Sequence, residues 1–253
     1  MFARHDLVWL TSRGWQRVYA GVPGQAWGAL ERWRERGWPA VVRRADAGQA
    51  PGEVAIGFAL PPRAGDGGKP KVGCRVELAD IGRHTGALPL AAALDAAPRQ
   101  WRASLALLER QAADAGLGLA VYGSVALAAL TGQRYLTPQS DIDVLLRVGS
   151  RHQLTKGLDL LARYAGALPL DGEAVFPDGR AVAWKELVAA HGAAPGTRVL
   201  CKGPDRIALV LPEALMATLE APACPNREPD RRDRAWAEAQ AQAHARAQAQ
   251  AQT

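Results

Sequence analysis

The sequence contains no long hydrophobic run, and this absence excludes an integral membrane protein. A membrane-spanning helix needs about 20 consecutive apolar residues, whereas the longest mildly apolar run, residues 87–94, is far shorter and contains a proline. The amino-terminal segment carries Arg4, His5 and Asp6, and no apolar segment with a small-residue cleavage site follows. A secretory signal is therefore not expected, and we predict a cytoplasmic protein with no membrane partner.

Cysteine is also scarce. The chain has three cysteines, Cys74, Cys201 and Cys224, which are widely separated in the sequence. An odd number at such spacings gives neither a paired disulfide framework nor a zinc-binding pattern. We expect reduced thiols with no catalytic role.

What the chain does contain is enough apolar sequence to fold. Of its 253 residues 48% are hydrophobic and 22% are charged, which excludes wholesale disorder. The 31 Lys and Arg residues outnumber the 25 Asp and Glu residues, for a net charge of +6. This excess indicates an anionic partner. The basic residues are scattered and no aromatic platform accompanies them, so nucleic acid is not expected.

The amino-terminal part is rich in tryptophan, with five of the eight Trp residues in the first 38 positions. This clustering predicts a core of its own. The apolar periodicity predicts one helix and three strands, in order over residues 26–36, 40–43, 54–60 and 74–78. We therefore expect a small α+β domain over residues 1–97.

A second pattern of alternating helices and strands follows. The expected elements are helices over residues 101–115, 124–130 and 154–164, strands over 117–121 and 142–146, and a hairpin formed by 168–176 and 180–184. This order implies an α+β domain over residues 98–220, with a mixed sheet and flanking helices. The Ala- and Gln-rich tail, residues 221–253, is expected to be flexible or a frayed helix.

Two short motifs in the second region point to chemistry. Side chains alternate along a strand, so Asp141 and Asp143 point to one face while Ile142 points into the sheet. Paired carboxylates repel each other unless a cation lies between them, and hard oxygen ligands suit Mg²⁺. Gly123 and Ser124 open the preceding helix, where free N–H groups can bind phosphate.

The order of these motifs resembles the nucleotidyltransferase superfamily of DNA polymerase β. The resemblance implies a nucleotidyltransferase-like sheet, two Mg²⁺ ions bound by Asp141 and Asp143, and a Gly-Ser pair that holds the leaving pyrophosphate. It also implies a third carboxylate on a later strand, for which Asp171 and Glu173 are the candidates. We favour Glu173, because Asp171 and the following glycine could form a simple bend.

A narrower resemblance covers most of the chain from residue 4 to about residue 210. The segments that carry it are residues 4–10, 121–124, 130–132, 140–143, 171–173 and 182–186. They are similar to the phosphoribosyl-dephospho-CoA transferase family of malonate decarboxylase, also called its holo-acyl-carrier-protein synthases. This resemblance implies transfer of the prosthetic group from 2'-(5''-triphosphoribosyl)-3'-dephospho-CoA to a serine of the apo acyl-carrier subunit, with release of pyrophosphate.

Roles follow for individual residues. Asp141, Asp143 and either Glu173 or Asp171 would be catalytic and bind metal, while Gly123 and Ser124 would bind the departing phosphates. Further possible phosphate contacts, for each of which ordinary surface charge is the simpler expectation, are Arg134, Lys185, Lys202, Arg43, Arg44, Lys69, Lys71 and Arg75. For His5 and Asp6 we expect a structural role.

Two other functions fit the same motifs. The first is a nucleotidyltransferase that uses a nucleoside triphosphate to modify a small molecule, a protein or RNA. The second is a non-catalytic nucleotide- or carrier-binding protein on the same fold. The intact Asp141 and Asp143 pair argues against the second, because carboxylates with no cation to bind have no reason to lie close together.

Overall fold

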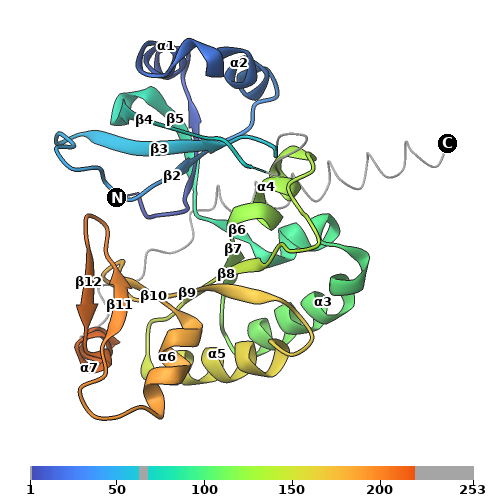
Figure 1. The fold of residues 1–253 in the computed structure, drawn as a ribbon, viewed down its shortest axis with the longest axis vertical. Helices are drawn as coiled ribbons and strands as arrows, with labels where there is room; N and C mark the ends of the chain where they lie inside the picture. The colour runs from blue at the N-terminus through green and yellow to red at the C-terminus, as the bar shows by residue number, and fades with distance from the viewer. Residues whose placement is uncertain (1, 63–67, 220–253) are drawn as a thin grey trace. The chain divides into compact units, whose positions relative to one another are not determined.

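A computed structural model of the chain describes residues 2–62 and 68–219. These residues form two β-sheets with helices packed on them (Figure 1). The mixture confirms the expected α+β class. The Ala- and Gln-rich tail and Cys224 lie outside the described residues, whereas Cys74 and Cys201 are buried and free. No helix in the described ranges is long and apolar enough to cross a membrane.

The first sheet is antiparallel and has the strand order β4-β3-β2-β1-β5. Its strands are β1 (Leu7–Leu10), β2 (Ala40–Val42), β3 (Glu53–Ala59), β4 (Lys71–Glu77) and β5 (Ile81–Thr85). Two helices, α1 (Ser12–Gly21) and α2 (Trp27–Glu35), follow β1 and lie on one face of this sheet (Figure 1), with the short turns η1 (Gly24–Ala26) and η2 (Leu78–Asp80) nearby in the chain.

The core of the first sheet is aromatic. Trp15 from α1 and Trp33 from α2 pack against Phe58 of β3, with ring centroids 5.5 and 5.8 Å from it. Val54, Ile56 and Phe58 alternate along β3 and all belong to this core. The tryptophan-rich region therefore supplies most of this core, which also takes in residues from beyond the first sheet, and Trp27 is 49% exposed.

The second sheet is mixed and has the order β12-β11-β10-β9-β8-β7-β6. Its strands are β6 (Leu88–Pro89), β7 (Leu119–Val121), β8 (Ile142–Arg147), β9 (Leu170–Val175), β10 (Ala181–Ala183), β11 (Val199–Lys202) and β12 (Ile207–Val210). Its helices are η3 (Leu90–Ala96), α3 (Arg99–Asp114), α4 (Gly123–Thr131), α5 (Arg151–Tyr164), α6 (Trp184–His191), α7 (Pro212–Met216) and η4 (Ala217–Leu219).

The central pair of this sheet, β8 and β9, is parallel, and the other strand pairs within the described ranges are antiparallel. A parallel pair needs a crossover connection, which α5 supplies. Ile142, Val144, Leu145 and Leu146 of β8 have no solvent exposure. In Figure 1, α3, α5 and α6 lie on one side of this sheet and α4 lies on the other. Strand β8 is therefore buried on both faces.

Helix α4 joins the two sheets into one compact unit (Figure 1). Leu127 of α4 packs into the aromatic core of the first sheet, and so does the fully buried Tyr135, whose hydroxyl donates to the Ala59 carbonyl at 2.7 Å. The chain leaves the first sheet after β5 and enters the second sheet at β6. The second sheet begins with β6 at Leu88, whereas the domain division at residue 98 stays a prediction.

Asp80 links α1 to the edge of the first sheet and carries a stability prediction. Its fully buried carboxylate accepts hydrogen bonds from the Arg17 guanidinium at 2.6 Å and the Glu77 amide at 3.0 Å. Burial alone would raise the pKa of Asp80, but these bonds outweigh burial and lower it below the ordinary value. The stabilisation is therefore present above the pKa of the unfolded chain and is lost as the pH falls through the lowered folded pKa.

We expect Asp80→Asn to reduce the free energy of unfolding by about 2 kcal/mol at neutral pH, because a charge-assisted bond is lost. Urea unfolding followed by circular dichroism measures this change. Asp159→Asn on the exposed face of α5 is the control and should cost little. An Asp80→Asn variant as stable as the wild type would show that the buried carboxylate contributes nothing.

Candidate active site

Three carboxylates meet at one end of the parallel strand pair. Asp143 of β8 and Asp171 of β9 are directly in register, and Asp141 immediately precedes β8. Oxygens of Asp141, Asp143 and Asp171 lie within 4.8 Å of one another. Asp141 is exposed, and the other two are partly buried. The pairing of β8 with β9 therefore brings together two carboxylates that are distant in sequence.

The start of α4 closes one side of this cluster. Tyr122 precedes the helix, and its amide donates to the Asp143 carbonyl at 3.0 Å. Gly123 then adopts a φ of +65°, and a side-chain carbon at this position would overlap Asp143 Oδ2. Only glycine fits both the left-handed backbone and the close approach of the carboxylate. The first turn of α4 is thus held directly against Asp143.

The next residue, Ser124, is buried. It contacts Lys69, which lies in the chain between β3 and β4 of the first sheet. The Ser124 hydroxyl accepts a hydrogen bond from Lys69 Nζ at 2.5 Å. Lys69 also acts electrostatically on Asp143 and opposes the rise in its pKa. The expectation that Lys69 is ordinary surface charge is therefore replaced by a place in the site. Nothing in the sequence around Lys69 indicates this contact.

The electrostatics of the cluster favour a bound cation. Burial, followed by the negative charges of Asp141 and Asp171, raises the pKa of Asp143 to about 7. Adjacent carboxylates of this kind repel one another unless a positive ion compensates them. Their oxygens are the hard ligands that divalent cations such as Mg²⁺ take. The donor set of Asp141, Asp143 and Asp171 therefore fits a metal ion.

Glu173 has a different environment from Asp171, although only one residue separates them. Its carboxylate is 3% exposed and pairs with Lys202 Nζ at 2.8 Å and Arg4 Nη1 at 3.3 Å. Burial alone would raise the pKa of Glu173, but the nearby His5 ring, the hydrogen bond from Lys202 and the charge of Arg4 lower it to about 2. Glu173 thus pairs with cationic side chains and is not in the three-carboxylate group. The geometry favours Asp171 as the third carboxylate, in contrast to the preference for Glu173 from the sequence.

His5 shares this buried contact and shows backbone strain. Among the described residues it is the non-glycine residue with positive φ, at +71°. Its amide donates to the Val42 carbonyl at 2.9 Å, and its ring lies 4.0 Å from that of Tyr122. Burial is the largest influence on His5 and lowers its pKa. These contacts agree with the structural role expected for His5.

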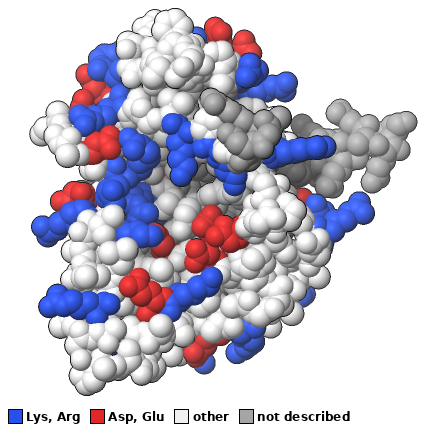
Figure 2. Space-filling model, viewed as in Figure 1, with Lys and Arg blue, Asp and Glu red and all other residues white. Residues whose placement is uncertain are grey.

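The remaining basic candidates separate in space. Lys185, at the start of α6, has its Nζ 3.7 Å from Asp171 Oδ1. Arg134 is exposed in the loop after α4, and no contact with the carboxylates is recorded for it among the described residues. Figure 2 shows a hollow in this face of the molecule, with acidic side chains on one side and basic side chains opposite.

A glycine-led helix beside a carboxylate cluster is typical of enzymes that transfer phosphorylated groups. Two family models match the chain. The model described as phosphoribosyl-dephospho-CoA transferase MdcG N-terminal domain matches residues 3–87, and the one for the MdcG C-terminal domain matches residues 89–213. The chain belongs to the phosphoribosyl-dephospho-CoA transferase family. The two matched regions meet where the chain passes from the first sheet to the second.

Curated relatives carry the same family name. A phosphoribosyl-dephospho-CoA transferase of Xanthomonas campestris pv. campestris strain 8004 is 38% identical over 188 residues, covering 74% of this chain and 85% of the relative. The protein of the same name from Bradyrhizobium diazoefficiens is 35% identical over 210 residues, covering 82% of this chain and 89% of the relative. No solved structure gives a significant match.

Proposed function

We propose that the protein transfers the phosphoribosyl-dephospho-CoA group from 2'-(5''-triphosphoribosyl)-3'-dephospho-CoA to a serine of the apo acyl-carrier subunit of malonate decarboxylase. Pyrophosphate is the second product. Membership of the transferase family supports the identity of the transferred group. The observation that carries the mechanism is the in-register pair of Asp143 and Asp171 beside the glycine-led start of α4.

The metal requirement is part of the proposal. Asp141, Asp143 and Asp171 would hold Mg²⁺, and the resemblance to nucleotidyltransferases implies two ions. When bound, Mg²⁺ supplies charge neutralisation for the triphosphate and stabilises the entering and leaving oxygens. The other residues of the site would position the donor and the carrier serine.

Residues next to the three carboxylates would bind the donor phosphates and orient the carrier serine. The amides at the start of α4, together with the Ser124 hydroxyl held by Lys69, would bind the outer phosphates of the donor. In the transfer, the carrier serine oxygen forms a bond to the α-phosphorus and the bond to pyrophosphate breaks. Asp171 would orient the serine and accept its proton, beside Lys185. Most of the rate would come from positioning and charge compensation.

A transfer assay tests this proposal. Purified protein, the triphosphoribosyl donor, Mg²⁺ and apo-carrier should increase the carrier mass by one phosphoribosyl-dephospho-CoA group and release one pyrophosphate per group. Excess EDTA should abolish both signals, and a carrier whose acceptor serine is alanine should gain no mass. An unchanged carrier mass in the complete mixture would refute the proposal.

The same assay separates the alternatives. ATP, CTP, GTP or UTP offered without the CoA-type donor should give no transfer to the carrier. Transfer from one of them, with none from the triphosphoribosyl donor, would instead identify a nucleotidyltransferase that uses a nucleoside triphosphate. Binding of donor and carrier without any product would identify a non-catalytic binding protein.

A further inference from the structure

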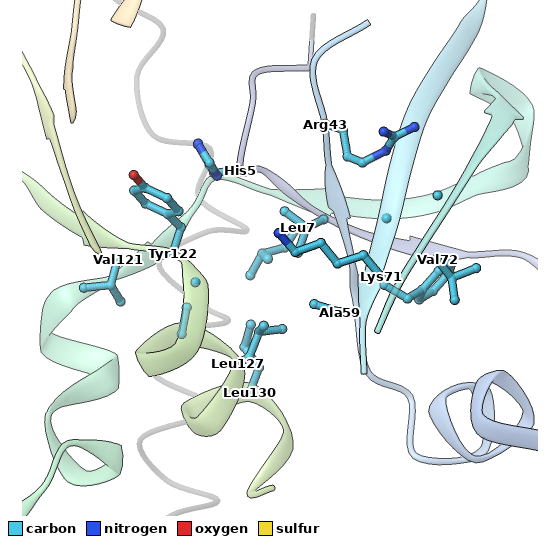
Figure 3. A pocket seen from close by; sticks show the side chains of 16 residues that line it. His5, Leu7, Arg43, Ala59, Lys71, Val72, Val121, Tyr122, Leu127 and Leu130 are labelled. Atoms are coloured by element: carbon cyan, nitrogen blue, oxygen red, sulfur yellow. The ribbon is translucent and has the colours of Figure 1, made fainter. Parts of the chain in front are cut away.

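A cavity of about 400 Å³ lies between the first sheet and α4, and it reaches the candidate active site at Gly123. One wall is formed by residues of the first sheet, including Gly57 and Ala59 of β3. The opposite wall is formed by Leu127 and Leu130 of α4 (Figure 3). Gly123, which packs against the Asp143 carboxylate, therefore also borders this cavity.

The cavity walls are largely apolar, but the Arg43 side chain covers part of the sheet side. It lies over Gly57 and Gly73, where an added side-chain carbon would come within 2.8 Å of Arg43 Cδ and 3.0 Å of Arg43 Cζ, respectively. The cavity volume lies near the lower end of the range for small-molecule sites, about 300–1,000 Å³. A space of this size holds one portion of a CoA-type molecule. The flat Arg43 guanidinium on the sheet side and the apolar helix wall suit a planar ring that stacks.

The polar side chains at the cavity are few and differ in availability. Arg43 is already bound, since its guanidinium donates to the Ile56 carbonyl at 3.0 Å and to Asp46 at 2.8 Å. Lys71 is exposed, and its ammonium group forms no hydrogen bond or ion pair with residues 2–62 and 68–219. Figure 3 shows its side chain reaching across the cavity toward Leu7. The cavity thus offers one ammonium group to a ligand.

We propose that this cavity binds the adenosine portion of the CoA-type donor, with Lys71 contacting the diphosphate that follows it. The proposal rests on the proposed function, because the donor's connectivity selects the occupant. One ribose separates the reacting α-phosphate from the adenosine, while the pantetheine arm lies beyond two further phosphates. The portion that enters a cavity beginning at Gly123 is therefore the adenosine.

The chemistry of the walls gives an independent reason to choose adenosine over pantetheine. The pantetheine arm carries two amides and a hydroxyl, and burying them without partners costs free energy. A purine has apolar faces that can contact the sheet and the helix, while its polar edge turns to the mouth. One ammonium at the mouth then suits an adjacent diphosphate better than it suits a neutral arm.

Calorimetric titration without carrier and with EDTA tests the site apart from metal and turnover. The probes are 3'-dephospho-CoA, adenosine and pantetheine. Wild type should bind the first two and bind pantetheine far more weakly. Ala59→Leu fills the cavity and should weaken binding of 3'-dephospho-CoA about tenfold. Ala59→Ser is the matched control, because it keeps the volume, and should weaken binding less than about threefold.

A second pair of variants tests the charge. Lys71→Met should weaken binding of 3'-dephospho-CoA about fivefold and leave adenosine binding unchanged, because adenosine has no phosphate. Arg75→Met is the control, since Arg75 lies on the same strand four positions away and does not line the cavity. Lys71 is exposed, so this variant remains informative if Ala59→Leu fails to fold in a thermal-unfolding measurement.

The outcomes are distinct. No binding of 3'-dephospho-CoA to the wild type, or equal affinity in Ala59→Leu and Ala59→Ser, would overturn the adenosine site. A loss of pantetheine binding alone in Ala59→Leu would assign the cavity to that arm and also overturn it. The proposed function fails separately, if the wild type binds 3'-dephospho-CoA as expected yet transfers nothing to the carrier.

Discussion

Gly123→Ala should lower the kcat/KM for transfer to the carrier at least about a hundredfold, a loss typical of a displaced catalytic group. The new methyl group would occupy the position of Asp143 Oδ2, so the carboxylate has to move away from Asp141 and Asp171. The left-handed backbone adds a cost of about 1–2 kcal/mol. Steady-state kinetics with the CoA-type donor, together with calorimetric Mn²⁺ binding, measures the effect.

Gly132 at the end of the same helix provides the matched control. Its φ is +68°, close to the +65° of Gly123, but no atom lies within 4 Å of an added side-chain carbon. Gly132→Ala should therefore lower the melting temperature through backbone strain alone and leave both transfer and metal binding near wild type. Equal kinetic losses in the two variants would show that backbone strain alone explains the effect.

Asp171→Asn and Glu173→Gln should have opposite consequences, although the two residues lie on one strand. Asp171→Asn should weaken Mn²⁺ binding and reduce kcat about a thousandfold or more, because a metal ligand and proton acceptor is lost. Glu173→Gln should retain Mn²⁺ binding but reduce the free energy of unfolding by about 3 kcal/mol. Its neutral side chain leaves Arg4 and Lys202 without their counter-charge.

Metal titration and urea unfolding of both variants check this pair. The reverse pattern, in which Glu173→Gln loses metal and Asp171→Asn loses only stability, would restore Glu173 as the third carboxylate. The double change Asp141→Asn and Asp143→Asn serves as the reference for complete loss of metal. If that double variant still transferred the group at the wild-type rate, the catalytic assignment of the whole cluster would be wrong.

The sequence predicted those elements whose apolar pattern is strong. Strand β8 and the helices α3 and α5 are present where periodicity placed them, and β9 and β10 form the hairpin expected across residues 177–179. The strand pairing that places Asp143 beside Asp171 required tertiary information, because α5 separates the two strands along the chain. The acidic residues of the candidate site could be predicted from the sequence, but the pairing of Asp143 with Asp171 could not.

The amino-terminal elements were missed although a signal existed. No strand over Leu7–Leu10 and no helix over Ser12–Gly21 was predicted, and β1 has only four residues. Thr11 caps α1, with its hydroxyl accepting from the Gly14 amide at 3.1 Å. A threonine before an apolar i, i+3 pair, here Trp15 and Val18, is a helix-start pattern that identifies α1.

The preference for Glu173 depended on the expected effect of Gly172. The sequence argument treated Asp171 and Gly172 as a simple bend. Gly172 does adopt a φ of +123°, but it stays in register with Val144 inside the parallel pair. A side chain there would overlap the Val144 backbone, so the glycine permits close approach of β9 to β8. Asp171 is thereby held beside Asp143 instead of being turned out of the strand.

The contact between Arg4 and Glu173 has a consequence for how the protein is made. The two residues are 169 positions apart, and Lys202, which completes the same charge group, comes later still. Synthesis on the ribosome delivers Arg4 long before Glu173 and Lys202. Contacts of such long sequence separation close slowly. The wall of the site next to Asp171 is therefore among the last parts of the molecule to assemble.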